Sequence, residues 1–330
     1  MVYKKFIIKL FIIVISLYIG YTYIIKYQKM WYLDSEYPMW LHVKTTMNAN
    51  IPLNYNTLML GDSGAKAGFI PTQDILKKSI NLSLGGSTPV EAYYILKHYL
   101  KNNNTPLQVI LAFGTGHLNG GSTYWYRTVK FDFLDEYEYE EIENLAKRFQ
   151  EKDIISFKKS YKDYKNIPAL YGKSFLNGII QQRWVSNEEI LNECFISKGH
   201  YYFGKLSSAP GYPKEMFKNR KKRIFTPSKL QDFYLTKLLT LMKLYNVKSY
   251  FYKMPYIQSV HKYRDKEYVK GYESYLHDLS WKFNMKICNK LWYLSNDNFG
   301  DNNHLYKGAS KVTSKIFKCL NEESKIENVK

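Results

Sequence analysis

Three short apolar runs that each end in a glycine turn constrain the fold of this chain most strongly. They are TLMLGDS at 57–63, SINLSLGGS at 79–87 and PLQVILAFGTG at 106–116. Short apolar runs that alternate with helical patterns are typical of a parallel α/β sheet. Ligand sites of such sheets lie at the carboxyl ends of the strands. We therefore predict an α/β fold with a mainly parallel sheet and a site among the three turns.

Helical patterns separate and follow these runs. We predict a helix from Thr88 to Leu100, because Pro89 and Glu91 stand in its first turn and apolar residues recur at helical spacing. The other elements that we expect are a helix that includes EEIENLAKRF at 140–149, a strand at 247–256 that ends at Pro255, and a C-terminal helix after the loop that begins at Asp297.

An uncharged stretch, LFIIVISLYIGYTYII, occupies residues 10–25. At ~1.5 Å per residue, a helix of this stretch nearly crosses a ~30 Å hydrocarbon layer, and Phe6 to Ile8 extend it if Lys9 reaches toward the headgroups. A cleaved signal peptide and a buried core helix are the alternatives, but no A-x-A-like cleavage site follows the stretch. We predict a membrane anchor.

The charges on either side of this stretch indicate its orientation. Lys4, Lys5 and Lys9 precede it, whereas the lysines that follow it are offset by Asp34 and Glu36. The positive-inside rule then favours a cytoplasmic N-terminus. We expect a single-pass protein of the cell membrane with an extracytoplasmic body.

The charge of the whole chain indicates the kind of partner. It has 48 Lys+Arg against 29 Asp+Glu, a net charge of +19. Such a field attracts nucleic acid, anionic lipid or a polyanionic envelope polymer. The basic run KNRKKR at 218–223 is more typical of a solvated face than of a binding site, and neither zinc-finger spacing nor an RNP-type motif occurs. We expect membrane lipid and an anionic or acylated envelope polymer as partners, and no nucleic acid.

The three cysteines, Cys194, Cys288 and Cys319, lie far apart in the sequence. They form no CxxC pair and have no neighbouring histidine at ligand spacing, which argues against a disulfide framework and a structural zinc site. We expect buried thiols, with a single disulfide as the alternative. No metal and no organic cofactor is implied.

Two distant segments carry chemistry that fits together. Ser63 follows the first apolar run, and Asp301 and His304 form a D-x-x-H pair before the last helix. A serine becomes a nucleophile when a base reaches it and an acid orients that base. The i, i+3 spacing lets the carboxylate hold the imidazole. The alternatives are that Ser63 caps a helix and that His304 is a solvated loop residue.

These segments carry a resemblance to a known family. With GDS after the first run, glycine turns after the second and third, and DNNH at 301–304, the chain resembles the SGNH/GDSL hydrolase superfamily. The resemblance covers residues 57 to about 318 and implies a three-layer α/β/α sandwich of the SGNH or flavodoxin-like kind. With its N-terminal stretch, the chain is most similar to membrane-tethered SGNH-like proteins of bacterial envelope polymer acylation, such as the group around the teichoic acid D-alanylation esterase and alginate acetylation factors. Their members often act beside a membrane-bound O-acyltransferase.

The family pattern implies a role for individual residues. It places the nucleophile on Ser63, the base on His304 and the orienting acid on Asp301. The backbone N–H of Gly85 or Gly86 would join that of Ser63 in an oxyanion hole, where one donor contributes ~3 kcal/mol.

The third turn departs from this pattern. The family has G-x-N-D there, whereas this chain has Gly116 at the asparagine position. His117 or Asn119 would have to supply the missing donor. We also expect Asp62, Asn119 and Arg127 to bind substrate; Arg127 suits an acidic group, with an ordinary salt bridge as its alternative role.

Together these features predict a serine acyl esterase or O-acyltransferase that acts on an envelope polysaccharide or a lipid-linked polymer. A lipase of free lipid esters is one alternative. A catalytically silent module that binds glycan or organises a polymer-export complex is another, which the departure at Gly116 favours. The expected divisions are an anchor at 1–29, a linker at 30–55 and a hydrolase-like domain at 56–330 with an insertion or cap at about 130–230.

Overall fold

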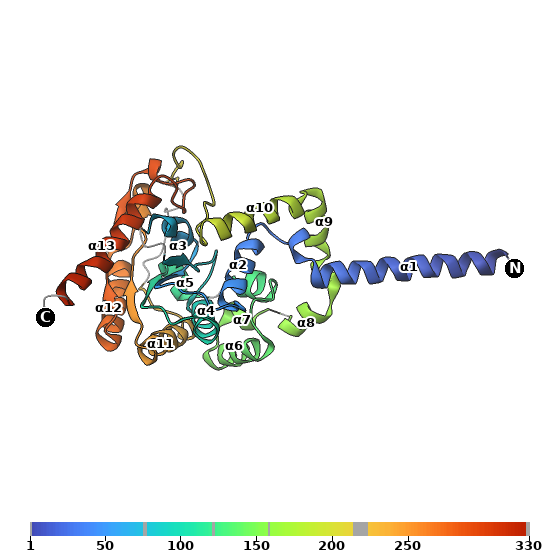
Figure 1. Cartoon of the computed structure of the whole chain (residues 1–330), viewed down its shortest axis with the longest axis horizontal. Coiled ribbons are helices and arrows are strands. Elements are labelled where there is room, and N and C mark those ends of the chain that lie inside the picture. Colours follow the sequence, from blue (N-terminus) through green and yellow to red (C-terminus); the bar gives the residue numbers. More distant parts are fainter. Residues whose placement is uncertain (1, 75–77, 121–122, 158, 214–223, 328–330) are drawn as a thin grey trace.

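The computed structural model describes residues 2–74, 78–120, 123–157, 159–213 and 224–327, and Figure 1 shows their arrangement. The basic run at 218–223 lies outside the described residues. A five-stranded sheet forms the centre of the body, and all its neighbouring strands are parallel. The predicted α/β class with a mainly parallel sheet is therefore confirmed. The strand order is β2 (Ser79–Asn81), β1 (Thr57–Gly61), β3 (Gln108–Ala112), β4 (Lys248–Phe251) and β6 (Lys286–Ile287).

Helices pack against both faces of the sheet. Leu58 and Leu60 of β1 belong to a core cluster with α4 (Pro89–Asn102) and α11 (Lys229–Leu244). Met59 points to the other face and belongs to a cluster with α3 (Ser63–Gly68) and α13 (Ala309–Glu327). Successive side chains of a strand point to opposite faces, so the apolar runs are explained by burial on both sides.

The predicted helix after the second turn is α4. Thr88 caps it, and the Glu91 side chain accepts from the Thr88 backbone N–H, which completes a capping box; Pro89 stands at the first helical position. These signals lie within the first turn of the helix, so the start of the helix can be predicted without knowledge of its packing. The predicted strand at 247–256 is shorter than expected. β4 ends at Phe251, and Tyr256 to Ile257 form β5, which pairs with β7 (Tyr293–Leu294) in a separate sheet.

The region between α4 and α11 is mostly helical. The predicted helix at 140–149 lies within α6 (Glu136–Phe149). The further helices are α5 (Thr115–Asn119), the π-helix η3 (Tyr124–Val129), α7 (Lys152–Ile155), α8 (Tyr161–Asn166), the 3-10 turn η4 (Pro168–Tyr171), α9 (Gly172–Ile180) and α10 (Arg183–Ile196). The last long helix before the C-terminal segment is α12 (Lys266–Phe283).

The N-terminal helix α1 (Val2–Tyr27) projects from the body as a long rod (Figure 1). Tyr3–Tyr27 is long and apolar enough to cross a membrane. The segment at 30–55, which we expected to be a linker, contains α2 (Tyr37–Met47), and its Trp40 and Val43 are buried in the core. This segment is therefore part of the packed body, because its apolar side chains find partners there.

The cysteines differ from the expectation of three thiols. Cys288 and Cys319 form a disulfide that joins the segment after β6 to α13. The expectation of buried thiols is wrong for these two, because the fold brings them together across 31 positions. Cys194 is a buried free thiol, as expected.

Candidate active site

A cavity of about 1140 Å³ lies at the carboxyl ends of the central strands. Residues that follow β1, β3 and β4 line it, among them Ser63, Gly114 and Lys253. Gly85, Gly86, His117, Arg127 and His304 also line it, and so does Asp62. The three glycine turns and the C-terminal loop thus meet at one site, although they are far apart in the sequence.

Ser63 is the first residue of α3, and Asp62 rather than Ser63 caps this helix. Asp62 Oδ1 accepts from Gly64 N at 2.8 Å, and its Oδ2 accepts from Gly114 N at 2.6 Å. The carboxylate therefore fastens the turn after β1 to the turn after β3. Gly61 allows this approach, because a Cβ there would lie 2.1 Å from the carbonyl oxygen of Ala112. Asp62 supplies the cap, so the Ser63 side chain is not needed for it, and Ser63 lines the cavity.

Asp301 and His304 form the predicted pair. Asp301 Oδ2 lies 2.8 Å from His304 Nδ1, and Oδ1 accepts from the backbone N–H groups of Asn303 and His304. Partial burial by itself raises the pKa of Asp301, but the His304 ring and these two amides outweigh it and hold the pKa below its usual value. The ionised carboxylate can only accept, so Nδ1 carries a proton and Nε2 is left as a base.

The imidazole of His304 rests on Phe203, with 4.5 Å between the ring centroids. Ser63 and His304 line the same cavity. No hydrogen bond joins Ser63 Oγ to His304 Nε2 in the part of the chain that the structure describes. Catalytic hydrogen bonds are often long before substrate binds.

The turn after β2 lines the cavity with Gly85 and Gly86. Gly86 adopts φ +70, a left-handed conformation that favours glycine. Among the described residues, the N–H groups of Gly85 and Gly86 have no hydrogen-bond partner, and neither has the N–H of Ser63. Such free donors at a turn and a helix N-terminus are suited to bind negative charge.

An ion pair that we did not predict covers this turn. Arg127 Nη2 lies 2.6 Å from Glu36 Oε1, and both side chains line the cavity. Glu36 Oε2 is buried without a hydrogen-bond partner among the described residues. Arg127 thus has the salt bridge that was its alternative role. Glu36 stands in the segment expected to be a linker, and no local motif distinguishes it there.

The third turn forms the short helix α5. His117 Nε2 lies 3.7 Å from Asp62 Oδ2, beside the cavity. A Cβ on Gly116 would meet no atom within 4 Å, and Gly116 is not among the glycines with positive φ. Asn119 is outside the residues that line the cavity and donates to the Tyr268 hydroxyl at 2.7 Å. The fold therefore brings His117 to the site but not Asn119.

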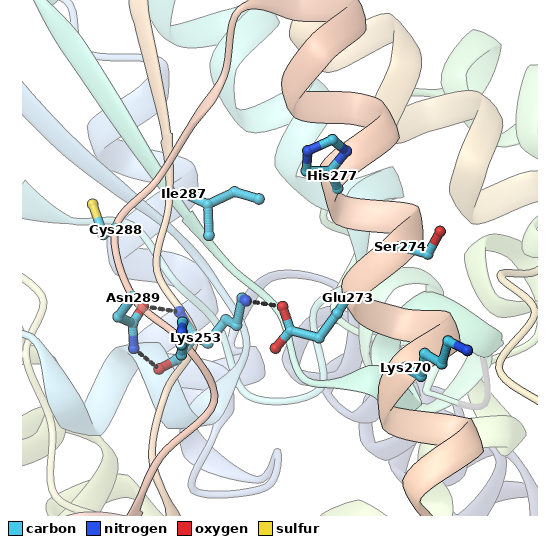
Figure 2. A pocket seen from close by; sticks show the side chains of 9 residues that line it. Lys253, Lys270, Glu273, Ser274, His277, Ile287, Cys288 and Asn289 are labelled. Carbon is cyan, nitrogen blue, oxygen red and sulfur yellow. Dashed lines mark hydrogen bonds and ion pairs between the residues drawn. The ribbon is translucent and has the colours of Figure 1, made fainter.

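Lys253 lies between this cavity and a second one of about 690 Å³, which Figure 2 shows. Glu273 of α12 points at the Lys253 ammonium and pairs with it. The second cavity also contains Ser274 and His277. His277 has no carboxylate partner among the described residues, so this cavity lacks the acid and base arrangement of the first.

One group of side chains away from the first cavity has donor atoms close enough to share a metal ion. Oxygen and nitrogen atoms of His98, Asp135 and Glu138 lie within 4.8 Å of one another. Lys97 and His98 already contact Glu138 Oε1, and the Asp135 side chain caps α6. These groups therefore have structural partners within the protein.

Neither the family models nor the curated proteins yield a match for this chain.

Proposed function

We propose that this protein is a membrane-anchored serine acyl esterase or O-acyltransferase of the SGNH type, with a three-layer α/β/α sandwich. The observation that carries the proposal is the convergence of Ser63, a carboxylate-oriented His304 and free backbone N–H groups on one cavity. A nucleophile, a base and an oxyanion hole are the three parts that acyl transfer needs.

In the proposed reaction, Ser63 Oγ attacks the acyl carbonyl while His304 Nε2 takes the hydroxyl proton. Asp301 keeps the proton on Nδ1 and stabilises the imidazolium. The carbon–oxygen bond to the leaving alcohol then breaks, and His304 returns the proton to that alcohol. In the second step water, or a hydroxyl group of the polymer, attacks the acyl carbon while His304 Nε2 takes its proton. The bond from the acyl carbon to Ser63 Oγ then breaks and His304 returns the proton to Ser63, which gives hydrolysis or transfer.

Negative charge develops on the carbonyl oxygen during both steps. The N–H groups of Ser63 and of Gly85 or Gly86 would bind it. His117 lies on the opposite turn and would donate from its imidazole in place of the asparagine of the family pattern. Each donor of this kind stabilises the transition state by ~3 kcal/mol.

The surroundings of the cavity suit an anionic or acylated envelope polymer. Its rim includes Lys262 and Arg264, and the Arg264 guanidinium lies 3.3 Å from the ring centroid of Tyr256. The net charge of +19 attracts such a polymer from a distance. Because α1 is long and apolar enough to span a membrane, we place the protein in the cell membrane with its body outside the cytoplasm. The Cys288–Cys319 disulfide supports an oxidising compartment. A membrane-bound O-acyltransferase would be the partner if the reaction is transfer.

A catalytically silent glycan-binding module is the second candidate. The missing hydrogen bond between Ser63 and His304, in the described part of the chain, favours it, as does the half-buried Glu36 carboxylate beside the turn. An uncompensated carboxylate there would repel a developing oxyanion. Its salt bridge with Arg127 removes most of that repulsion.

A fluorophosphonate probe separates the two candidates. The full chain, purified in detergent, should be labelled on Ser63, and Ser63→Ala should abolish the labelling. The matched control is Ser274→Ala in the second cavity, which should be labelled like the wild type. Absence of labelling in a wild type that binds acidic glycan would establish the silent module, and labelling that persists in Ser63→Ala would place the nucleophile elsewhere.

A further inference from the structure

The helix α9 and the preceding turn η4 surround the base of α1. The Tyr21 ring packs edge-on against Phe175 of α9, with 5.5 Å between the centroids, and its hydroxyl donates to the carbonyl oxygen of Pro168 at 3.4 Å. Ile25 of α1 is only 3% exposed. Figure 1 shows α9 beside the point where α1 meets the body. We call residues 167–185 the collar.

The length of α1 determines how far from the membrane surface the collar lies. A membrane span needs about twenty apolar residues, and Phe6 to Ile25 supply about that number. The span therefore uses the apolar length of α1 down to Ile25. Tyr21 lies one turn before Ile25, about 6 Å deeper along the helix axis. Because the collar contacts Tyr21, it lies at the depth of the membrane surface and not above it.

Several large apolar side chains of the collar are exposed. Leu176 is 60% exposed and Ile180 is 77% exposed, and they lie one turn apart on α9. Trp184 and Val185 at the start of α10 are also exposed. A cluster of this kind is costly in water, whereas a tryptophan and aliphatic side chains are favourable at the interface of a bilayer. The exposed Lys173 adds a cation for anionic headgroups.

The collar is fixed to the chain that leaves the anchor. A Cβ on Gly178 would lie 2.4 Å from Tyr32 Cα, so α9 touches this segment backbone to backbone. Arg183 Nη1 lies 2.9 Å from Asp34 Oδ1, and the Asn187 side chain donates to the carbonyl oxygen of Leu33 at 3.0 Å. The collar therefore cannot turn relative to the segment that follows α1 without breaking these contacts.

We propose that the collar inserts its apolar face into the interfacial layer of the membrane next to α1, so that the body is held at a fixed height and orientation. The proposal rests on α1 being a membrane span and names the lipid surface as the occupant. The body would then have two attachments, a span and an interfacial helix. A body held in this way would keep its cavity at a constant distance from a lipid-linked substrate.

Fluorescence quenching in the full chain tests this proposal. Leu176→Cys and Ile180→Cys are labelled with an environment-sensitive dye and reconstituted in vesicles of phosphatidylcholine and phosphatidylglycerol. The matched control is Leu244→Cys, an equally exposed apolar position (74%) on α11, far from α1. The native Cys194 is buried and the other two cysteines are paired. We expect shallow spin-labelled lipid to quench the two collar dyes strongly, and aqueous iodide to quench them several-fold less than the control dye.

The outcomes separate the collar from the anchor. If the chain floats with the vesicles but iodide quenches all three dyes equally, the anchor stands and the collar proposal is overturned. If iodide reaches the collar dyes in pure lipid but loses access in native membranes, the occupant is a protein and the lipid proposal is overturned. If the chain does not float, both the anchor and the collar are overturned, while labelling of Ser63 by a fluorophosphonate is unaffected.

Discussion

The Glu36 carboxylate lies against the backbone of Gly85. A methyl group on this glycine would place its carbon 2.3 Å from Glu36 Oε2, and Arg127 holds the same carboxylate from the other side. A residue outside the recognisable motifs therefore limits the turn that would supply the oxyanion hole.

Gly85→Ala should impair the turn, because either the Glu36 side chain or the backbone must move. A displacement of about 1 Å at a catalytic group can lower turnover about a hundredfold. Turnover of an activated acyl ester by the full chain in detergent measures it. The control is Gly116→Ala in the neighbouring turn, where a Cβ meets no atom within 4 Å. This variant should keep a turnover close to that of the wild type. Equal turnover in wild type and Gly85→Ala would show that this turn takes no part in the reaction.

Asp301→Asn should invert the tautomer of His304. The amide oxygen of the variant can still accept the two hydrogen bonds that the backbone N–H groups of Asn303 and His304 donate to Asp301 Oδ1, so the fold is retained. The amide NH₂ then faces Nδ1, which moves the proton to Nε2 and removes the base. We expect turnover to fall about 10⁴-fold. Asp297→Asn, in the same loop, is the control and should keep full turnover. A small loss in Asp301→Asn would mean that His304 is not oriented by this carboxylate during the reaction.

His117→Ala should lower turnover about a hundredfold with little change in KM if its imidazole is the displaced oxyanion donor. Gly116→Asn should partly restore it, because Gly116 has free space around it and does not have positive φ. Steady-state kinetics of the single and double variants measure both effects. An unchanged kcat in His117→Ala would exclude this histidine as a donor.

Stability should fall as the pH is lowered from 7 to 5, because two buried histidines resist protonation. Burial and then the charge of Lys66 lower the pKa of His42 to about 3, and burial lowers that of His200 to about 4. In the unfolded chain a histidine titrates near ~6.5, so the unfolded state binds more protons below that pH. Each residue should cost about 2 kcal/mol at pH 5 relative to pH 7.

Urea unfolding of the full chain in detergent at both pH values measures this effect. In His42→Asn the free energy of unfolding should decrease less between pH 7 and pH 5 than in the wild type. His277→Asn, at an exposed position, should show the same decrease as the wild type. A wild type with equal free energies of unfolding at pH 5 and pH 7 would contradict the burial of these rings.

Loss of the disulfide should lower stability by about 3 to 4 kcal/mol, since the bond closes a loop of 31 positions. The double variant Cys288→Ser and Cys319→Ser shows the loss in denaturant unfolding. Dithiothreitol should destabilise the wild type to the same level and leave the double variant unchanged. If reductant affects both proteins equally, the bond is not formed in solution.

The sheet could be predicted from the sequence because its signals are local. The three apolar runs become β1, β2 and β3, and the signals at Thr88, Pro89 and Glu91 define the start of α4. The length of β4 could not be predicted in the same way. Its neighbour β6 pairs with it over only two residues, so the strand ends where its partner ends and not where the apolar pattern ends.

The same difference between local signals and contacts of distant segments applies to the candidate site. The i, i+3 spacing of Asp301 and His304 predicts their contact, which the structure contains. The position of Glu36 over Gly85, and the pairing of Cys288 with Cys319, depend on contacts between segments that are distant in the sequence. Neither has a periodicity or a spacing that could indicate it. Asn119 is not among the residues that line the cavity, and its side chain donates to the hydroxyl of Tyr268, which does line it.

The C-terminal helix α13 forms hydrogen bonds with the end of α3, the helix that begins at Ser63. Thr313 Oγ1 accepts from Ile70 N at 3.0 Å and donates to the carbonyl oxygen of Gly68 at 3.2 Å, and 243 positions separate Ile70 from Thr313. During synthesis, a chain therefore exposes its serine long before His304 or α13 has left the ribosome. The candidate site is therefore completed last, because an unfinished chain has Ser63 without the histidine that lines the same cavity and without the helix that binds the end of α3.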